Sequence, residues 1–373
     1  MFDSDLYREV RKPLLDAQTL PSHCYTSDEF FRREKQRIFS DTWHFVGRED
    51  ELPESGCVLV VETMVGSALV CRDENGGIRG FINACRHRGT KLKEQSGRCR
   101  QLVCPYHAWS YGLDGRLRTA PGMGEVNNFD PKDFPLQSLK LESVGGFIFI
   151  SFDANAAALG RWLGDFPDVM QSHHLSDLRC VKRFSFSINA NWKFLIENSL
   201  EAYHTGTVHQ STLGAQDSES VDTQGQWDAL YVLSDETKSI ATLPGQTQGL
   251  PFIQGLNEKA KRGTWFTAIY PCTQIVFSQD CVWWLDFKPV NVSQTTLTIG
   301  ACFPSSTVAM TDFDRQVQPY YDRWTRATAE DNAIAEAQQR GHQLALETAG
   351  RYAATEHCVH QLNNWVLDQV LDH

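Results

Sequence analysis

The spacing of apolar and polar residues changes in character along the chain. Residues 27–39 place four apolar side chains near one face of a helix, behind a cap at Ser27 or Asp28. From Trp43 to about residue 152, short β-like runs alternate with turns rich in Gly and Asp. The runs include residues 57–61, 67–71, 78–82 and 146–152, and the segments 75–77 and 113–116 are typical of hairpin turns. This part of the sequence predicts a helical arm followed by a small all-β module.

The second half of the chain has a different pattern. A polar, partly helical connector covers residues 153–180, and the segment 210–260, rich in Gln, Ser, Gly and Asp, predicts a loop that covers a site. Alternating apolar and polar residues predict strands at 183–188, 264–270, 274–278, 281–287 and 295–303, with a hairpin at 279–280. Residues 311–340 and 355–371 predict helices. We therefore expect an α+β protein with three parts: an arm at 1–42 that packs on the last part, an all-β domain at 43–155, and a larger domain at 156–373 with an antiparallel sheet and flanking helices.

Composition narrows the classes of function. The chain has 373 residues, of which 41% are hydrophobic and 22% charged, as in globular proteins. Its net charge of -11 argues against nucleic acid or an anionic membrane as the main partner. The N-terminus has no secretory pattern, and no apolar run approaches the length of a membrane span. Eleven scattered cysteines, an odd number, predict reduced thiols or metal ligands, and hence a cytoplasmic protein.

Two short segments of the β-module combine thiols with imidazoles. Cys85 and His87 form one pair, Cys104 and His107 the other, and sixteen residues separate the pairs. A set of two Cys and two His could hold a structural zinc, although zinc fingers usually pair Cys with Cys and His with His. Loops that each supply one thiolate and one imidazole can instead hold a [2Fe–2S] cluster, both thiolates on one iron and both imidazoles on the other. Spacing and β context favour the cluster.

A second candidate metal site lies in the segment 191–209. His204 and His209 are separated by four residues, and the carboxylates of Glu197 and Glu201 precede them. Two imidazoles and one carboxylate with open positions are the arrangement of non-haem Fe(II) centres that activate O₂. The third ligand must come from elsewhere in the chain. Two histidines near a helix end could also be ordinary surface or packing residues.

Taken together, the two motifs resemble the Rieske non-haem iron oxygenases, specifically their terminal oxygenase α-subunits. The resemblance covers most of the chain and implies a helix-grip, START-like catalytic domain, a Rieske [2Fe–2S] cluster and a mononuclear Fe(2+). It implies cluster ligands Cys85, His87, Cys104 and His107, and iron ligands His204 and His209. In that family the third iron ligand is an Asp in a Glu-Asp pair that precedes a Gln-Arg-Gly turn. The segment 330–341 fits this pattern, so Asp331 is the expected ligand and Glu330 the close alternative.

The resemblance also implies partners. Glu201 would bridge His204 to a cluster-ligating histidine of a neighbouring subunit, which requires a closed ring, usually a homotrimer. Asn198 and Tyr203 are candidates to support the iron site, and Tyr203 could equally be a packing residue. Because the chain has no flavin or nicotinamide fingerprint, electrons must come from a separate NAD(P)H reductase. We expect an oxidoreductase that acts with O₂ on a small organic substrate.

The sequence indicates the substrate less closely than it indicates the metal sites. The length favours homo-oligomeric members that hydroxylate or demethylate, and residues 355–365 resemble the quaternary-amine branch. Hydroxylation or O-demethylation of an aromatic compound is the alternative, and an electron-transfer Rieske protein without oxygenase activity is the alternative of another class. His357 and His360 are interpreted as terminal-helix residues. Aromatic residues of the expected sheet could bind an ammonium, stack on a ring or fill the core: Trp227, Tyr231, Trp265, Phe266, Tyr270, Trp283 and Trp284.

Overall fold

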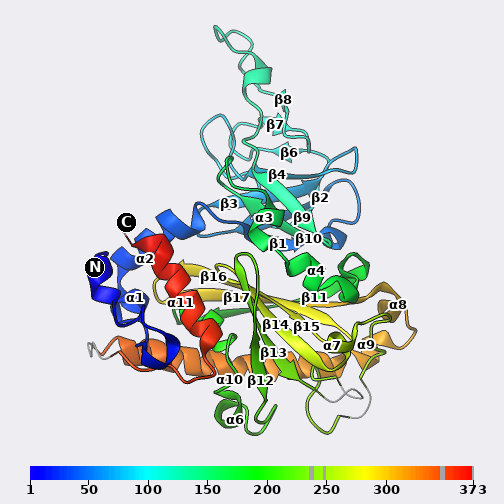
Figure 1. Ribbon diagram of the computed structural model, residues 1–373. Coiled ribbons are helices and arrows are strands. Elements are labelled where there is room, and N and C mark those ends of the chain that lie inside the picture. Colours follow the sequence, from blue (N-terminus) through cyan, green and yellow to red (C-terminus); the bar gives the residue numbers. More distant parts are fainter. Residues whose placement is uncertain (235–238, 247–248, 345–348, 372–373) are drawn as a thin grey trace. The chain divides into compact units, whose positions relative to one another are not determined.

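The computed structural model describes residues 1–234, 239–246, 249–344 and 349–371 (Figure 1). The chain divides into two compact units. One unit is Phe39–Leu159, and the other combines Met1–Ile38 with Gly160–His373. The N-terminal arm therefore belongs to the same unit as the C-terminal half of the chain. No helix within the described ranges has the length and apolar character that crossing a membrane requires.

The unit Phe39–Leu159 is built from three small antiparallel sheets. The first, in spatial order, contains β1 (His44–Arg48), β10 (Phe147–Ser151) and β9 (Lys140–Val144). The second contains β4 (Ile78–Ile82), β3 (Ser67–Arg72), β2 (Cys57–Glu62) and β5 (Gly97–Arg98), and the third β6 (Leu102–Val103), β7 (Ser110–Tyr111) and β8 (Leu117–Thr119). Both predicted hairpins are confirmed, because β3 pairs with β4 and β7 pairs with β8.

The other unit contains a seven-stranded antiparallel sheet. In spatial order its strands are β11 (Leu178–Ile188), β17 (Gln294–Pro304), β16 (Val282–Asn291), β15 (Thr273–Phe277), β14 (Gly263–Ile269), β13 (Trp227–Leu233) and β12 (Ser218–Val221). The hairpin predicted at 279–280 is confirmed, since Phe277 pairs with Val282 and the Ser278 N–H donates to the Cys281 carbonyl at 3.0 Å. The α+β class and the antiparallel sheet are as predicted.

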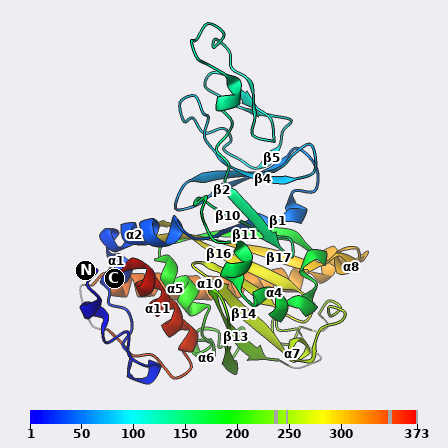
Figure 2. The same ribbon diagram turned by 45° about the horizontal axis from the view of Figure 1, so that its top comes forward.

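Helices flank this sheet (Figures 1 and 2). They are α1 (His23–Thr26), α2 (Asp28–Glu34), α4 (Phe166–Val169), α5 (Trp192–Asn198), α6 (Thr205–Val208), α7 (Glu258–Lys261), α8 (Ser305–Val308), α9 (Phe313–Gln316), α10 (Gln318–His342) and α11 (His357–Val370). A further helix, α3 (Leu159–Leu163), begins at the last residue of the first unit, and a π-helical turn covers Lys35–Phe39. Short 3-10 turns cover Ser4–Tyr7, Leu14–Asp16, Glu49–Glu51, Pro131–Asp133, Gln171–His173 and Leu175–Asp177.

The ends of several elements differ from the sequence prediction. The loop expected over 210–260 contains strands β12 and β13, while residues 235–238 and 247–248 of that segment lie outside the described residues. Six consecutive residues of β13 are buried, so it lacks the alternation by which a half-buried strand is recognised. The helix predicted at 311–340 is two helices, because Pro319 opens α10 in its first turn, and α10 continues through Gly341 to His342. The final helix and the cap at Ser27 are confirmed, since the Ser27 hydroxyl accepts from the N–H groups of residues 29 and 30.

Candidate metal centres

The start of helix α5 joins the N-terminal arm to the sheet unit. The Asn191 side chain accepts the Lys193 N–H at 3.1 Å and so caps the helix. The Trp192 indole N–H donates to Glu34 Oε2 at 3.2 Å, and Lys193 Nζ lies 2.5 Å from Glu34 Oε1. The side chains of Lys193 and Glu34 are fully buried. The Asn-Trp-Lys segment of the iron motif therefore anchors helix α2, and His204 and His209 follow it in sequence.

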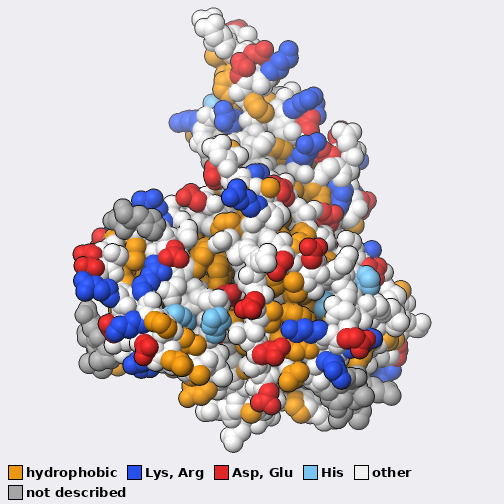
Figure 3. Space-filling model, viewed as in Figure 1, with side chains coloured by type: hydrophobic (Ala, Val, Ile, Leu, Met, Phe, Trp, Pro, Cys, Tyr) orange, Lys and Arg blue, Asp and Glu red, His pale blue; other side chains and the backbone are white. Residues whose placement is uncertain are grey.

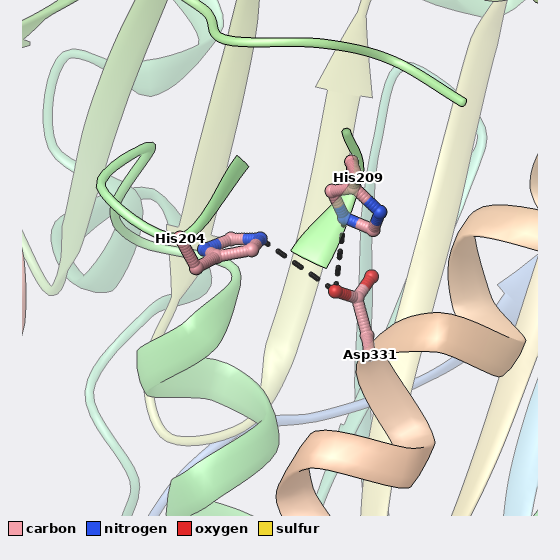
Figure 4. Close-up of side chains that lie close together, drawn as sticks. All are labelled: His204, His209 and Asp331. Carbon is pink, nitrogen blue, oxygen red and sulfur yellow. Dashed lines mark ion pairs between the residues drawn. The ribbon is translucent and has the colours of Figure 1, made fainter. Parts of the chain in front are cut away.

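Three candidate ligands converge in the sheet unit (Figure 4). His204 precedes α6, His209 follows it, and Asp331 lies on α10, which packs against both α5 and α6. Asp331 Oδ1 lies 3.0 Å from Nε2 of His209 and 3.5 Å from Nε2 of His204, and one ligand atom from each residue lies within 4.8 Å of the others. Among the described residues, none gives this buried oxygen a hydrogen bond of acceptable geometry. Two imidazole nitrogens and a carboxylate oxygen directed at one point fit a divalent iron.

In both histidines, Nδ1, the ring nitrogen that faces away from Asp331, has a carboxylate partner. Glu201 Oε1 lies 2.6 Å from Nδ1 of His204, and Glu330 Oε2 lies 2.6 Å from Nδ1 of His209. The Thr212 hydroxyl also donates to Glu330 Oε2 at 2.6 Å. Glu330, the alternative third ligand, is thus turned toward the far side of His209, and the carboxylate that converges with the imidazoles is that of Asp331. Such partners set the tautomer and the orientation of ligating histidines.

The two supporting candidates lie in different surroundings. Asn198, the last residue of α5, lines the cavity beside His204. Tyr203 is 71% exposed in the single chain, so its ring does not pack in the interior of this chain. Sequence reasoning missed the roles of Glu330 and Thr212 at His209, because nothing in the sequence shows which oxygen of the Glu-Asp pair faces which nitrogen.

The cluster motif lies on two loops of the β unit. Cys85 and Cys104 are buried, and the rings of His87 and His107 are 4.8 Å apart between centroids. His107 Nδ1 is enclosed and has no hydrogen-bond partner among the described residues. The Tyr111 hydroxyl lies 3.2 Å from Cys85 Sγ. An enclosed imidazole nitrogen without a partner, near two buried thiols, fits a metal group held between the loops.

A two-iron cluster and a single zinc require different arrangements of the four ligands. In a tetrahedral zinc site all four ligand atoms surround one ion at about 2.0–2.3 Å. Within the described part of the chain, the only such compact group of His, Cys and acidic ligands is that of His204, His209 and Asp331. In a Rieske cluster, by contrast, the thiolates and the imidazoles bind different irons, so their four ligand atoms need not surround one point. Near these loops, Trp109 is buried and stacks on His87, whereas Tyr106 is 57% exposed.

A cavity of about 800 Å³, part of it open to solvent, adjoins the three converging residues. Its wall is largely apolar, and among the sheet aromatics the sequence singled out, Phe266 and Trp283 line it. The other five are buried: Trp227, Tyr231, Trp265, Tyr270 and Trp284. The lining also contains Phe287, Trp324 and Arg323, which sequence reasoning did not identify. The two-residue period of β16 places Trp283 and Phe287 on the same face, so that signal was available for Phe287.

Comparisons with protein-family models agree with both motifs. Residues 42–130 match the model described as "Rieske [2Fe-2S] domain", and residues 175–372 match "Ring hydroxylating alpha subunit (catalytic domain)". The chain belongs to the family of ring-hydroxylating oxygenase α-subunits with a Rieske domain. Its cofactors are accordingly a Rieske [2Fe–2S] cluster and a mononuclear iron.

Curated relatives are oxygenase subunits. The chain is 34% identical to the carnitine monooxygenase oxygenase subunit of Acinetobacter pittii over 55% of this chain and 56% of that protein. It is 32% identical to the subunit of the same name in Escherichia coli K12, over 70% and 67%. The glycine betaine monooxygenase oxygenase subunit of Pseudomonas aeruginosa PAO1 is 27% identical over 95% and 89%. The first of these matches thus spans little more than half of its relative.

Solved structures show the same architecture. The apo form of a quaternary ammonium Rieske monooxygenase is 25% identical, covers 95% of each chain and has a TM-score of 0.77. Naphthalene 1,2-dioxygenase from Rhodococcus sp. with bound indole is 22% identical, covers 100% of this chain and 99% of that chain, and has a TM-score of 0.79. The likeness to the second structure bears on the fold alone.

Proposed function

We propose that this chain is the terminal oxygenase of a multicomponent Rieske non-haem iron system. It uses O₂ and electrons from a separate NAD(P)H-dependent reductase to hydroxylate or oxidatively demethylate a small quaternary amine. The observation that carries the proposal is the convergence of His204, His209 and Asp331 at the wall of a largely apolar cavity. A metal with open positions beside a substrate-sized cavity suits O₂ activation next to a bound organic molecule.

Each candidate residue has a proposed role. Cys85, His87, Cys104 and His107 hold the cluster, and His204, His209 and Asp331 hold the iron. When bound, these groups supply single electrons and activated oxygen, respectively. Glu201 orients His204 through the 2.6 Å contact with its Nδ1, and Asn198 lines the cavity beside the iron ligands. The chain itself contributes orientation of the ligands and exclusion of water from the apolar wall.

The aromatic wall supports a quaternary amine as substrate. Phe266, Phe287 and Trp324 line the cavity, and aromatic faces attract a trimethylammonium group that cannot donate hydrogen bonds. The relatives named for carnitine and glycine betaine point to the same class of compound. Oxidation of an aromatic substrate remains the alternative, and it becomes the preferred one if no amine is consumed.

We further propose that the protein works as a cytoplasmic homotrimer. All eleven cysteines lie within the described residues, and none of them forms a disulfide, which suits a reducing compartment. Glu201 has its Oε1 at His204, and its side chain keeps 11% exposure, where a group from a neighbouring subunit would approach it. In a closed ring, each copy would place its cluster histidine against Glu201 of the next copy.

Metal content and turnover test the proposed function together. The protein should contain about three irons and two sulfides per chain, and with a reductase and NADH it should consume O₂ and form product from a quaternary amine. Asp331→Asn should contain about two irons, keep the visible spectrum of the cluster and form no product. Asp322→Asn is the matched control, because Asp322 is exposed on the same helix. Two irons in the unaltered protein, or product formation by Asp331→Asn, would contradict the proposal.

A further inference from the structure

Figure 3 shows one face of the molecule, on which apolar and charged side chains are mixed. Away from the surface, a buried cation lies in the wall of the cavity described above. Arg323 is only 5% exposed, lies on α10 and lines the same space as Asp331. Asp331 follows Arg323 by eight positions on the helix, a rise of about 12 Å between the two backbone positions. Burial lowers the pKa of Arg323 to about 10, so its guanidinium still carries its charge at neutral pH.

Among the residues that the structure describes, the Arg323 guanidinium has one hydrogen-bond acceptor and one aromatic contact. Its Nε–H donates to the Ile240 carbonyl at 3.0 Å, and its central carbon lies 5.3 Å from the centroid of the Trp283 ring. Among the described residues it forms no ion pair with a carboxylate and no second hydrogen bond. The terminal N–H groups, the part of the fork that binds carboxylates bidentately, therefore have no protein acceptor there.

The two acidic residues that line the cavity contact the histidines of the metal site. Glu201 contacts Nδ1 and the backbone N–H of His204, and Asp331 converges with the imidazoles of His204 and His209. Asp331 attracts the Arg323 guanidinium electrostatically, but the two side chains form no ion pair. Taking the guanidinium out of water requires desolvation, and this longer-range attraction offsets only part of that cost. A stack on Trp283 and one hydrogen bond offset part of this cost, and an anionic ligand in the cavity would offset more.

We propose, on the basis of the proposed function, that Arg323 is a specificity-determining residue that binds a carboxylate of the substrate. The substrate is then a carboxylate-bearing molecule: its anionic end pairs with the guanidinium, and its other end reaches toward His204, His209 and Asp331. A quaternary amine that ends in an alcohol or an amide lacks this contact and binds weakly. The apolar wall between the two ends holds the connecting carbons.

Matched pairs of compounds test this inference. We would measure dissociation constants for L-carnitine, glycine betaine and benzoate, each against its primary amide, by thermal shift and calorimetry on the iron-loaded protein without reductase. One charge-assisted contact is strong enough that each preferred carboxylate should bind roughly 10- to 150-fold more tightly than its amide. Arg323→Gln should remove this preference and leave amide binding within about threefold, and Arg323→Lys should retain part of it.

A control variant and two measurements of metal content separate an effect on binding from an effect on folding. Arg326→Gln, an exposed arginine of the same helix, should keep the preference, and iron content and the cluster spectrum should be unchanged in every variant. Equal affinity of the unaltered protein for all three carboxylates and their amides would overturn the inference whether or not Arg323→Gln folds. The inference would also be overturned if Arg323→Gln weakened the binding of a carboxylate and of its amide by the same factor. Arg323-dependent carboxylate binding without oxidation of any amine would instead contradict the proposed function and leave this inference standing.

Discussion

Glu201 contacts His204 at two points. Its Oε1 lies 2.6 Å from Nδ1 of the imidazole, and its Oε2 accepts the backbone N–H of the same residue at 3.0 Å. The ring is therefore fixed with Nε2 toward Asp331 Oδ1. Glu330 provides the corresponding contact at Nδ1 of His209. Two carboxylates that are not themselves at the convergence point thus orient both imidazoles, which is how proteins raise the basicity of ligating histidines.

We expect substitution of Glu330 to weaken iron binding. Glu330→Gln keeps the shape of the side chain but replaces the charged acceptor at His209 Nδ1, and loss of such a partner typically costs about 10- to 100-fold in metal affinity. Iron retention against a graded chelator measures this affinity, with the cluster spectrum as an internal reference. Glu258→Gln is the control, because the Glu258 side chain is 86% exposed on helix α7. Unchanged iron retention in Glu330→Gln would show that the contact has no role in holding the metal.

Tyr111 provides a prediction for the cluster. Its hydroxyl lies 3.2 Å from Cys85 Sγ and accepts the Arg86 N–H at 3.0 Å. A hydrogen bond to a cluster sulfur stabilises the more negative, reduced state and so raises the potential. If the bond favours that state by about 1.4 kcal/mol, Tyr111→Phe lowers the one-electron potential by about 59 mV.

Spectroelectrochemical titration of the intact protein measures the potential of Tyr111→Phe. Tyr106→Phe is a suitable comparison, because Tyr106 is largely exposed. This second variant should leave the potential nearly unchanged. An equal potential in Tyr111→Phe and in the unaltered protein would mean that the hydroxyl does not donate to the sulfur.

The buried pair of Lys193 and Glu34 predicts a large effect on stability. Lys193→Met leaves the Glu34 carboxylate without its cation at a site with no exposure, and breaking a buried pair costs about 3–5 kcal/mol. Urea unfolding, followed by the change in tryptophan fluorescence, measures this cost. The double variant Lys193→Met with Glu34→Met should recover part of the stability, because no unpaired charge is then buried. If Lys193→Met were as stable as the unaltered protein, the Glu34 carboxylate would not depend on Lys193 for its stabilisation.

Much of the site could be predicted from the sequence because its ligands lie close together in the chain. Cys85 with His87, and His204 with His209, are separated by a few residues, so a local loop or turn brings each pair together. Asp331 lies far away in the sequence, and the resemblance to a family, rather than spacing, connects it to the histidines. The structure places Asp331 Oδ1 3.0 Å from His209 Nε2, which local sequence reasoning could not have provided.

Other features depend on tertiary packing and leave no local signal. Arg323 lies in the cavity wall on α10, beside the buried Trp324, and a charged residue type gives no local signal that its side chain is buried. Strand β13 lies in a segment whose polar composition suggested a loop, because its burial on both faces removes the two-residue period. The hairpins were predictable, since Gly and Asp turns determine them locally.

Glu197 gives the protein a pH dependence of stability with a definite sign. Burial raises its pKa to about 8, although its carboxylate accepts the Tyr25 hydroxyl at 2.9 Å. The folded state therefore keeps a proton that the unfolded chain has lost between about pH 4.5 and 8, so stability falls as pH rises through this window, by up to about 1.4 kcal/mol per pH unit. Glu197→Gln mimics the protonated form and does not lose this stability as pH rises. The difference in free energy of unfolding between Glu197→Gln and the unaltered protein should therefore grow in favour of the variant by up to about 1.4 kcal/mol per pH unit between about pH 5.5 and 7.5. Urea unfolding at several pH values, with the exposed Glu29→Gln as control, measures the difference, and a difference that does not change with pH would rule out the raised pKa.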